Sequence, residues 1–105
     1  MARLPSSFRK VNRTTRNFRE QYAKLPEEAR RAVRNGCRLF HRSPDHPSLR
    51  RHALEYRKSS QQAPGSFSVS VTMQYRAIFL VQDGVNVWYW VGTHAEYKTF
   101  TASKL

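Results

Sequence analysis

The sequence of 105 residues contains a single cysteine, Cys37, so it cannot form an internal disulfide bond. Its four glycines are separated from one another, which excludes a glycine-rich loop that cradles phosphate groups. No apolar run is long enough to span a membrane, and none at the N-terminus is typical of a signal peptide. The length fits one domain, residues 1–105, and these absences favour a cytoplasmic protein without a membrane partner.

Metal and cofactor sites have little support either. The four histidines, together with Cys37, do not have the spacing of zinc ligands. Cys37 falls in a stretch of helical periodicity, where a lone cysteine is more often a small core residue than a nucleophile. We therefore expect no metal ion and no small-molecule cofactor.

Acidic residues are scarce. Seven Asp and Glu stand against 19 Lys and Arg, which gives a formal net charge of +12. Residues 1–58 hold 16 of the basic residues and five of the acids, so the first half of the chain carries the charge. Arginine outnumbers lysine 14 to 5, and a guanidinium group grips phosphate bidentately and stacks on bases. The composition indicates an RNA or DNA partner, and the alternative is an acidic protein that covers the charge.

The clearest β pattern lies in residues 66–97. Apolar and polar residues alternate strictly from Ser66 to Met73, as in a half-buried strand. Residues 77–81 are apolar at every position, which predicts an interior strand covered on both faces. Asp83-Gly84 is typical of a tight hairpin that leads into a third strand at residues 85–91. The sequence therefore predicts a three-stranded antiparallel meander.

Two helices are predicted before the meander. Thr14 or Thr15 can cap the first helix, which runs to about residue 24 with an apolar stripe on one face. Pro26 suits the first turn of the second helix, whose apolar positions recur at helical spacing as far as Phe40. Residues 1–13 show no clear period, and we interpret them as an N-terminal arm.

The remaining segments complete the predicted fold. Residues 48–54 are predicted to form an edge strand and residues 58–65 a polar loop. Thr93 and Glu96 have the T-x-x-E spacing of a capping box, which predicts a short C-terminal helix. The predicted fold class is α+β: two N-terminal helices packed on a small antiparallel sheet, made of the edge strand and the meander, with a short C-terminal helix.

A basic stripe follows the second predicted helix. Arg30, Arg34 and Arg38 recur every four residues, with Arg31 and Arg42 beside them. Like charges at this spacing weaken an isolated helix by roughly a few tenths of a kcal/mol per pair, so the stripe indicates a contact surface. We interpret Arg30, Arg34 and Arg38 as candidate RNA-binding residues, and the alternative is an ordinary solvated helix face.

Several short motifs follow one another along the chain. They are Leu25-Pro26, Ser43-Pro44 before Pro47-Ser48-Leu49, Tyr75-Arg76-Ala77, and Val91-Gly92-Thr93-His94-Ala95-Glu96-Tyr97. In this order, over roughly residues 14–100, the sequence resembles the RelE/ParE toxin superfamily of bacterial type II toxin–antitoxin systems. The likeness is closest to RelE/HigB-like members with a W-x-G-[ST]-H-x-x-Y pattern, which begins here at Trp90.

The resemblance implies a compact toxin that an antitoxin protein holds inactive and that, in RelE-like members, cuts mRNA on the ribosome without a metal. RNA can be cleaved by its own 2′-hydroxyl group, so the enzyme need only align the nucleotide, move protons and stabilise the phosphorane. With this resemblance, Arg76 is the candidate phosphate clamp and His94 the candidate general acid or base. Tyr97 is the third catalytic candidate, because it could stack on a base or share the proton transfer.

Each catalytic candidate also has a purely structural interpretation. Arg76 could form a buried ion pair with Glu55 or Glu96. Without the resemblance, His94 is better interpreted as a helix-capping or surface histidine. Tyr97 would then be a residue at the edge of the core.

Three further RNA-binding candidates lie on the predicted edge strand. They are Arg50, Arg51 and His52, which could bind phosphates that flank the cleavage site. Because alternate residues of a strand share a face, we expect Arg50 and His52 on one face and Arg51 on the other.

The chain departs from the best-known nucleases of the superfamily at one place. Those proteins often carry a further basic residue on the strand before the Tyr-Arg pair. In this chain the corresponding residues, 68–72, include no basic side chain. Two alternatives therefore stay open: a ParE-like inhibitor of DNA gyrase, and a non-catalytic RNA-binding or ribosome-binding protein on the same fold. The expected partners are a cognate antitoxin, mRNA and the ribosome with its rRNA.

Overall fold

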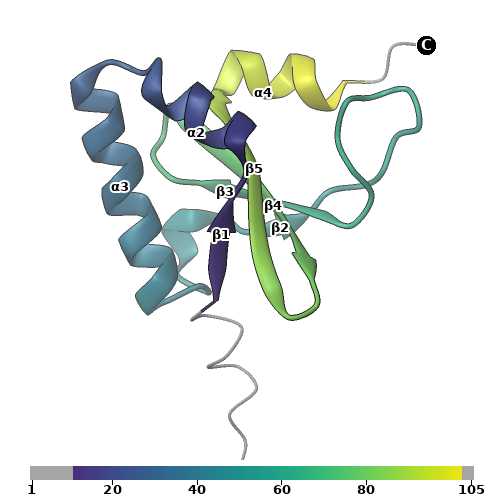
Figure 1. Cartoon of the computed structure of the whole chain (residues 1–105), viewed down its shortest axis with the longest axis horizontal. Helices are drawn as coiled ribbons and strands as arrows, with labels where there is room; N and C mark the ends of the chain where they lie inside the picture. Colours follow the sequence, from purple (N-terminus) through teal and green to yellow (C-terminus); the bar gives the residue numbers. More distant parts are fainter. Residues whose placement is uncertain (1–10, 103–105) are drawn as a thin grey trace, which may run out of the picture.

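A five-stranded sheet in the order β1-β5-β4-β3-β2 lies at the centre of the molecule (Figure 1). The structure is a computed structural model and describes residues 11–102. Strands β3 (Ser66–Ser70), β4 (Tyr75–Gln82) and β5 (Val85–Thr93) form the predicted antiparallel meander, with β4 as the central strand of the sheet. Asp83 and Gly84 have φ angles of 53° and 77°, as a tight hairpin turn requires. The predicted α+β fold class is confirmed.

The edge strand is shorter than predicted. Strand β2 comprises only His52–Ala53 and pairs antiparallel with β3. Pro47–Leu49 forms a 3₁₀ helix, and Arg50 has a left-handed φ of 46° that ends this helix. The predicted strand over residues 48–54 is therefore confirmed only at residues 52–53, and before them a proline that fixes φ near the helical value begins a helical turn.

Strand β1 (Asn12–Thr14) was not predicted. It pairs parallel with β5, and Asn12 Oδ1 accepts hydrogen bonds from Asn86 Nδ2 at 3.1 Å and from Trp88 Nε1 at 2.9 Å. Residues 12 and 13 of the predicted N-terminal arm therefore belong to the sheet. Residues 1–10 of that arm lie outside the described residues.

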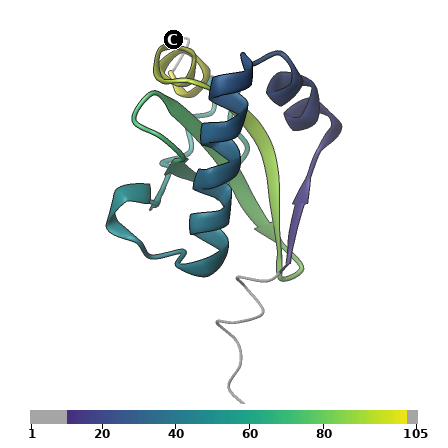
Figure 2. The ribbon, with the colours of Figure 1, turned by 90° about the vertical axis from the view of Figure 1, so that its left-hand side faces the viewer.

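Both predicted N-terminal helices are present. Helix α2 (Arg16–Ala23) is capped by Thr15, whose Oγ1 accepts a hydrogen bond from the backbone N–H of Phe18 at 3.1 Å. Helix α3 (Glu27–Arg42) follows Pro26 and lies across one face of the sheet (Figure 2). Gly36 lets it come close to the end of β3, because a Cβ atom at this position would lie 2.4 Å from the carbonyl oxygen of Val71. Within residues 11–102, no helix has the length and apolarity needed to cross a bilayer.

The main core lies between α3 and the sheet. Phe79 of β4 is fully buried at its centre, with T-shaped ring contacts to Phe40, Phe67 and Trp88 at centroid distances of 5.4, 5.3 and 4.6 Å. Cys37 packs against this core, and burial raises the pKa of its thiol to about 11. The thiol is therefore protonated at neutral pH, which fits the core residue that the sequence predicts rather than a nucleophile.

A bulge in β5 directs its two tryptophans to opposite faces of the sheet. Ile78 pairs with Trp90 and Phe79 pairs with Trp88, so Tyr89 is the extra residue between them. Trp88 consequently faces α3, whereas Trp90 stacks on Phe100 of helix α4 (His94–Thr101) with ring centroids 5.1 Å apart. The second face of the sheet is thus covered in part by α4.

The predicted capping box starts α4. Thr93 Oγ1 accepts a hydrogen bond from the backbone N–H of Glu96 at 3.1 Å, and Glu96 Oε1 accepts one from the backbone N–H of Thr93 at 2.8 Å. These two bonds fix the direction in which α4 leaves β5, and with it the placement of the side chains in the first turn.

Candidate active site

The three predicted catalytic residues lie together where β4 begins and β5 runs into α4. Arg76 is the second residue of β4 and pairs with Gly92 of β5. Its Cζ atom lies 6.0 Å from the centroid of the Tyr97 ring. The ring of His94 lies on Tyr97, with the centroids 6.1 Å apart and the planes inclined by 19°. The fold therefore assembles Arg76, Tyr97 and His94 into one cluster, called the Arg76 cluster below.

The charge of Arg76 is not neutralised by a carboxylate. Its Nη1 donates to the carbonyl oxygens of Thr72 and Met73, both at 3.4 Å, and no Asp or Glu among residues 11–102 lies within ion-pair distance. The alternative interpretation, a buried ion pair with Glu55 or Glu96, is wrong, because neither carboxylate lies within ion-pair distance of Arg76, and Glu96 Oε1 serves the capping box. The half-buried guanidinium therefore retains a full positive charge beside an aromatic ring.

The turn before β4 positions two members of the Arg76 cluster, a role that sequence reasoning did not reveal. Thr72 Oγ1 accepts hydrogen bonds from the backbone N–H groups of Gln74 and Tyr75 at 3.0 and 2.9 Å, which orders the turn. The carbonyl oxygen of Gln74 then accepts from the backbone N–H of His94 at 3.0 Å. The sequence does predict a turn near Met73-Gln74, and a hydroxyl residue just before it, Thr72, is the signal that could have identified its positioning role.

Gly92 allows the close contact between α4 and β5. A Cβ atom at Gly92 would lie 2.7 Å from Glu96 Oε1 and 2.8 Å from the indole ring of Trp90. Trp90 in turn supports the Tyr97 ring, at a centroid distance of 6.3 Å. Tyr97 is half-buried and His94 is exposed, so the Arg76 cluster is accessible to a large substrate.

The strand beside Arg76 supplies no basic side chain. Ser70 pairs with Arg76 across β3 and β4, and Ser68 is buried with no hydrogen-bond partner for its Oγ among residues 11–102. Within the Arg76 cluster, His94 and Tyr97 are therefore the groups that can move a proton. No set of three or more His, Cys, Asp or Glu side chains in the described part of the chain is arranged to hold a metal ion.

Of the predicted RNA-binding residues near β2, His52 lies in the sheet, two strands from Arg76, and Arg50 and Arg51 directly precede the strand. His52 pairs with Ser68, and its Nδ1 lies 2.9 Å from the carbonyl oxygen of Arg50. Arg51 forms an ion pair with Asp45 at 2.5 Å. Arg50 is exposed but lies outside the strand, so the expectation that it shares a strand face with His52 is wrong.

The arginines of α3 lie away from the Arg76 cluster, on the helix that covers the other face of the sheet. Arg30 Nη1 donates to the carbonyl oxygen of Leu25, and its Nη2 pairs with Glu27 Oε1, both at 2.5 Å. This guanidinium lowers the pKa of the Glu27 carboxyl. Arg34 donates to the hydroxyl of Tyr22 at 2.6 Å. Arg30 thus holds the junction of α2 and α3, a role that the helical spacing alone did not reveal.

No protein-family model and no curated protein matches the sequence. Solved structures match the fold. YafQ from Escherichia coli BL21(DE3) gives a TM-score of 0.61 at 15% identity, over 82% of this chain and 94% of that chain. A chain of the Mycobacterium tuberculosis toxin–antitoxin complex RelBE2 gives 0.58 at 24% identity, over 80% and 96%. A chain of the E. coli DinJ-YafQ toxin–antitoxin complex gives 0.60 at 14% identity, over 84% and 96%.

These identities are too low to transfer an activity, and what they establish is the architecture. In each case the match extends over nearly the whole of the compared chain. The chain therefore has the RelE/YafQ-type toxin fold, and the resemblance to the RelE/ParE superfamily that the sequence predicts is confirmed at the level of the fold.

Proposed function

We propose that this chain is the toxin of a type II toxin–antitoxin system and that it cleaves mRNA on the ribosome as a metal-independent endoribonuclease. The observation that carries the proposal is the Arg76 cluster, in which an unpaired guanidinium, an imidazole and a phenol meet at an accessible site. The fold supports the same conclusion, because two of the matching structures are toxin–antitoxin complexes.

The chemistry requires few groups. The 2′-hydroxyl group of the substrate gives up its proton as its oxygen attacks the adjacent phosphorus, the bond from phosphorus to the 5′ oxygen breaks, and the leaving 5′ oxygen takes up a proton. Arg76 binds the phosphate and stabilises the negative charge that grows on the phosphorane. His94 exchanges the proton with the attacking or the leaving oxygen, and Tyr97 stacks on a base or assists this transfer.

Basic residues outside the Arg76 cluster would hold the rest of the RNA. In this proposal Arg50, Arg51 and His52 bind phosphates that flank the cleavage site, because His52 lies in the same sheet as Arg76 and the two arginines directly precede it. The net charge of +12 favours association with rRNA, and this part of the binding should weaken with added salt. RNA binding by Arg30, Arg34 and Arg38 stays a separate prediction, since α3 covers the other face. The partner that controls the toxin in the cell would be a cognate antitoxin protein.

Induced expression of the chain in bacteria tests the proposal against its alternatives. We expect incorporation of labelled methionine to stop before incorporation of labelled thymidine, and new 5′ ends to appear in translated mRNAs. Early loss of thymidine incorporation with DNA breaks would instead support inhibition of gyrase. Arrest of translation without any new mRNA end would support a ribosome-binding protein that does not cleave.

A further inference from the structure

A pocket of about 590 Å³ lies between α4, the junction of α2 and α3, and the loop before β3. It is called the α4 pocket below. Its apolar wall includes Leu25, Trp90 and Phe100. Its polar lining includes a carboxylate, an ammonium group and an amide, which belong to Glu96, Lys24 and Gln21. A concave site of this size, with a few polar groups beside apolar walls, is typical of a pocket that binds a small ligand or one part of a larger one.

One indole ring lies between the α4 pocket and the Arg76 cluster. Trp90 lines the pocket and stacks on Phe100, which also lines it, at a centroid distance of 5.1 Å. The same indole supports Tyr97 of the Arg76 cluster at 6.3 Å. Glu96 of the pocket directly precedes Tyr97 in α4. The pocket is therefore near enough to receive the base of a nucleotide whose neighbouring phosphate is held by Arg76.

The carboxylate of Glu96 is fixed and keeps one oxygen available. Its Oε1 accepts from the backbone N–H of Thr93 at 2.8 Å, whereas Oε2 has no hydrogen-bond partner among residues 11–102. Glu96 also forms no ion pair in this part of the chain, and it is exposed. A carboxylate in this state can accept hydrogen bonds from two adjacent donors, because each of its oxygens has two lone pairs.

Gln21 and Lys24 supply donors on the α2 side of the pocket. Gln21 Oε1 accepts from the backbone N–H of Val91 at 3.0 Å, so the amide is fixed and its Nε2 donors remain unused within residues 11–102. Lys24 is exposed and has no ion pair with a described carboxylate. The α4 pocket thus combines a fixed acceptor, a fixed donor and a mobile cation with an apolar wall.

Guanine matches this set of groups better than the other bases of RNA. Its N1–H and N2–H₂ groups are adjacent donors that fit a carboxylate, and its O6 and N7 atoms are acceptors that fit an amide N–H. Adenine and cytosine place a ring-nitrogen acceptor beside the amino group, and a carboxylate repels that acceptor. Uracil has a single N–H between two acceptors.

We propose that the α4 pocket binds a guanine base, with Glu96 accepting from N1–H and N2–H₂, Gln21 donating to O6 or N7, and Lys24 against the phosphate of the same nucleotide. A guanine in RNA and a free guanine nucleotide share this chemistry. That the guanine belongs to an mRNA, beside the cleaved bond, rests on the proposed function, whereas recognition of the base does not.

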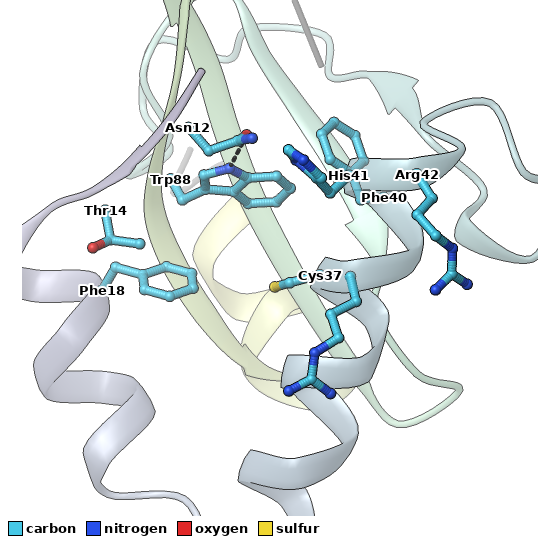
Figure 3. A pocket seen from close by; sticks show the side chains of 9 residues that line it. Asn12, Thr14, Phe18, Cys37, Phe40, His41, Arg42 and Trp88 are labelled. Carbon is cyan, nitrogen blue, oxygen red and sulfur yellow. Dashed lines mark hydrogen bonds between the residues drawn. The ribbon is translucent and has the colours of Figure 1, made fainter. Parts of the chain in front are cut away.

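The cavity between α3 and β1 lacks the groups for this recognition (Figure 3). It is lined by Phe18, Phe40 and Trp88, and no Asp or Glu belongs to its lining. Figure 3 shows the indole N–H of Trp88 directed at Asn12, whose Oδ1 accepts its hydrogen bond at 2.9 Å. Each cavity thus contains one of the two tryptophans, and Trp88 provides an internal control for Trp90.

Titration of the full-length protein with GMP, AMP and IMP, followed by NMR, tests the proposal. IMP differs from GMP only in lacking the 2-amino group, and AMP carries the same ribose and phosphate with a different base. The indole N–H signals of Trp90 and Trp88 report on the two cavities separately. We expect GMP to shift the Trp90 signal without the Trp88 signal and to bind at least about tenfold more tightly than AMP, with IMP between them.

Two substitutions exchange donors and acceptors while keeping the local structure. Glu96→Gln retains the capping box, since glutamine also accepts at this position, but it should reduce the preference for GMP over AMP to less than about threefold. Gln21→Glu keeps the acceptor for the Val91 N–H and removes the amide donors, so GMP binding should weaken at least about tenfold. Glu28→Gln is the matched control: this exposed glutamate of α3 lies outside the pocket lining, and GMP binding should not change.

The hexanucleotides UUGUUU and UUAUUU identify the source of the base. Tighter binding of UUGUUU than of GMP, reported at Trp90, would assign the site to a guanine in RNA, and equal or weaker binding would assign it to a free guanine nucleotide. The proposal would be overturned by equal binding of GMP and AMP, by a shift at Trp88 instead of Trp90, by no shift with either GMP or UUGUUU, or by an unchanged guanine preference in Glu96→Gln. Binding is measured without cleavage, so a failed nuclease assay does not affect this result.

Discussion

Arg76→Ala is expected to lower the rate of ribosome-dependent mRNA cleavage by about 10²- to 10³-fold without unfolding the protein. Arg76 carries an unneutralised charge, and its hydrogen bonds to the Thr72 and Met73 carbonyl oxygens are both 3.4 Å long. Loss of these two weak bonds affects folding little, because the side chain is only half-buried. Loss of the charge at the phosphate affects the transition state directly. Single-turnover cleavage of a ribosome-bound mRNA measures the rate.

Two further variants separate the role of charge from that of shape. Arg76→Lys keeps the charge but loses the planar fork, so its rate should lie between those of wild type and Arg76→Ala. Arg57→Ala is the matched control, because Arg57 is an exposed arginine whose Nη1 donates to the carbonyl oxygen of Thr101 at the far end of α4. Arg57→Ala should retain nearly full activity. Wild-type cleavage by Arg76→Ala, with an unchanged melting temperature, would show that Arg76 is not the phosphate clamp.

Phe79→Ala is expected to lower the free energy of unfolding by about 3–5 kcal/mol. The side chain is fully buried, and three aromatic rings pack on it edge to face. Rigid rings held by a helix and two neighbouring strands cannot move in to fill the space that the ring leaves. For a domain of this size, such a change removes a large part of the total stability. Urea unfolding followed by tryptophan fluorescence measures it.

Val81→Ala provides the comparison within the same strand. Val81 is 40% exposed near the end of β4, so its truncation should change the unfolding free energy by less than about 1 kcal/mol. A loss below about 1 kcal/mol for Phe79→Ala would contradict the packing described for the core.

Local signals in the sequence were sufficient to predict much of this fold. Thr15 caps α2, the Thr93 and Glu96 pair caps α4, and Asp83-Gly84 makes the hairpin. Each of these features depends on residues within four positions of one another, so the sequence contains the whole interaction. The fully apolar run of β4 likewise predicted its place at the centre of the sheet.

Features that depend on distant residues could not be predicted in this way. Strand β1 is polar and three residues long, and it is held by Asn12 hydrogen bonds to residues more than 70 positions away. The sequence pattern of β5 does not reveal the bulge at Tyr89. Because of this bulge, Trp88 faces α3 and Trp90 faces α4. Both features arise from pairing between strands, which a single sequence does not record.

The candidate site also combines a feature that the local sequence predicts with features that it does not. Arg76 stood out as a charge in an apolar strand, whereas His94 and Tyr97 became catalytic candidates only through the resemblance to known toxins. Their meeting in one cluster depends on the close approach of α4 to β5 at Gly92. The helical spacing of Arg30, Arg34 and Arg38 did not reveal that Arg30 binds the Leu25 carbonyl oxygen inside the α2–α3 junction.

Primer extension on an mRNA translated by purified ribosomes is the most direct test of the proposed activity. The reaction is run with wild-type protein, with His94→Ala, and with the same RNA without ribosomes. His94 is exposed and its ring stacks on the half-buried Tyr97, so the variant should fold normally, as a melting curve will check. We expect new 5′ ends that require both the ribosome and His94. Folded wild-type protein that arrests growth but produces no new 5′ end would contradict cleavage as its activity.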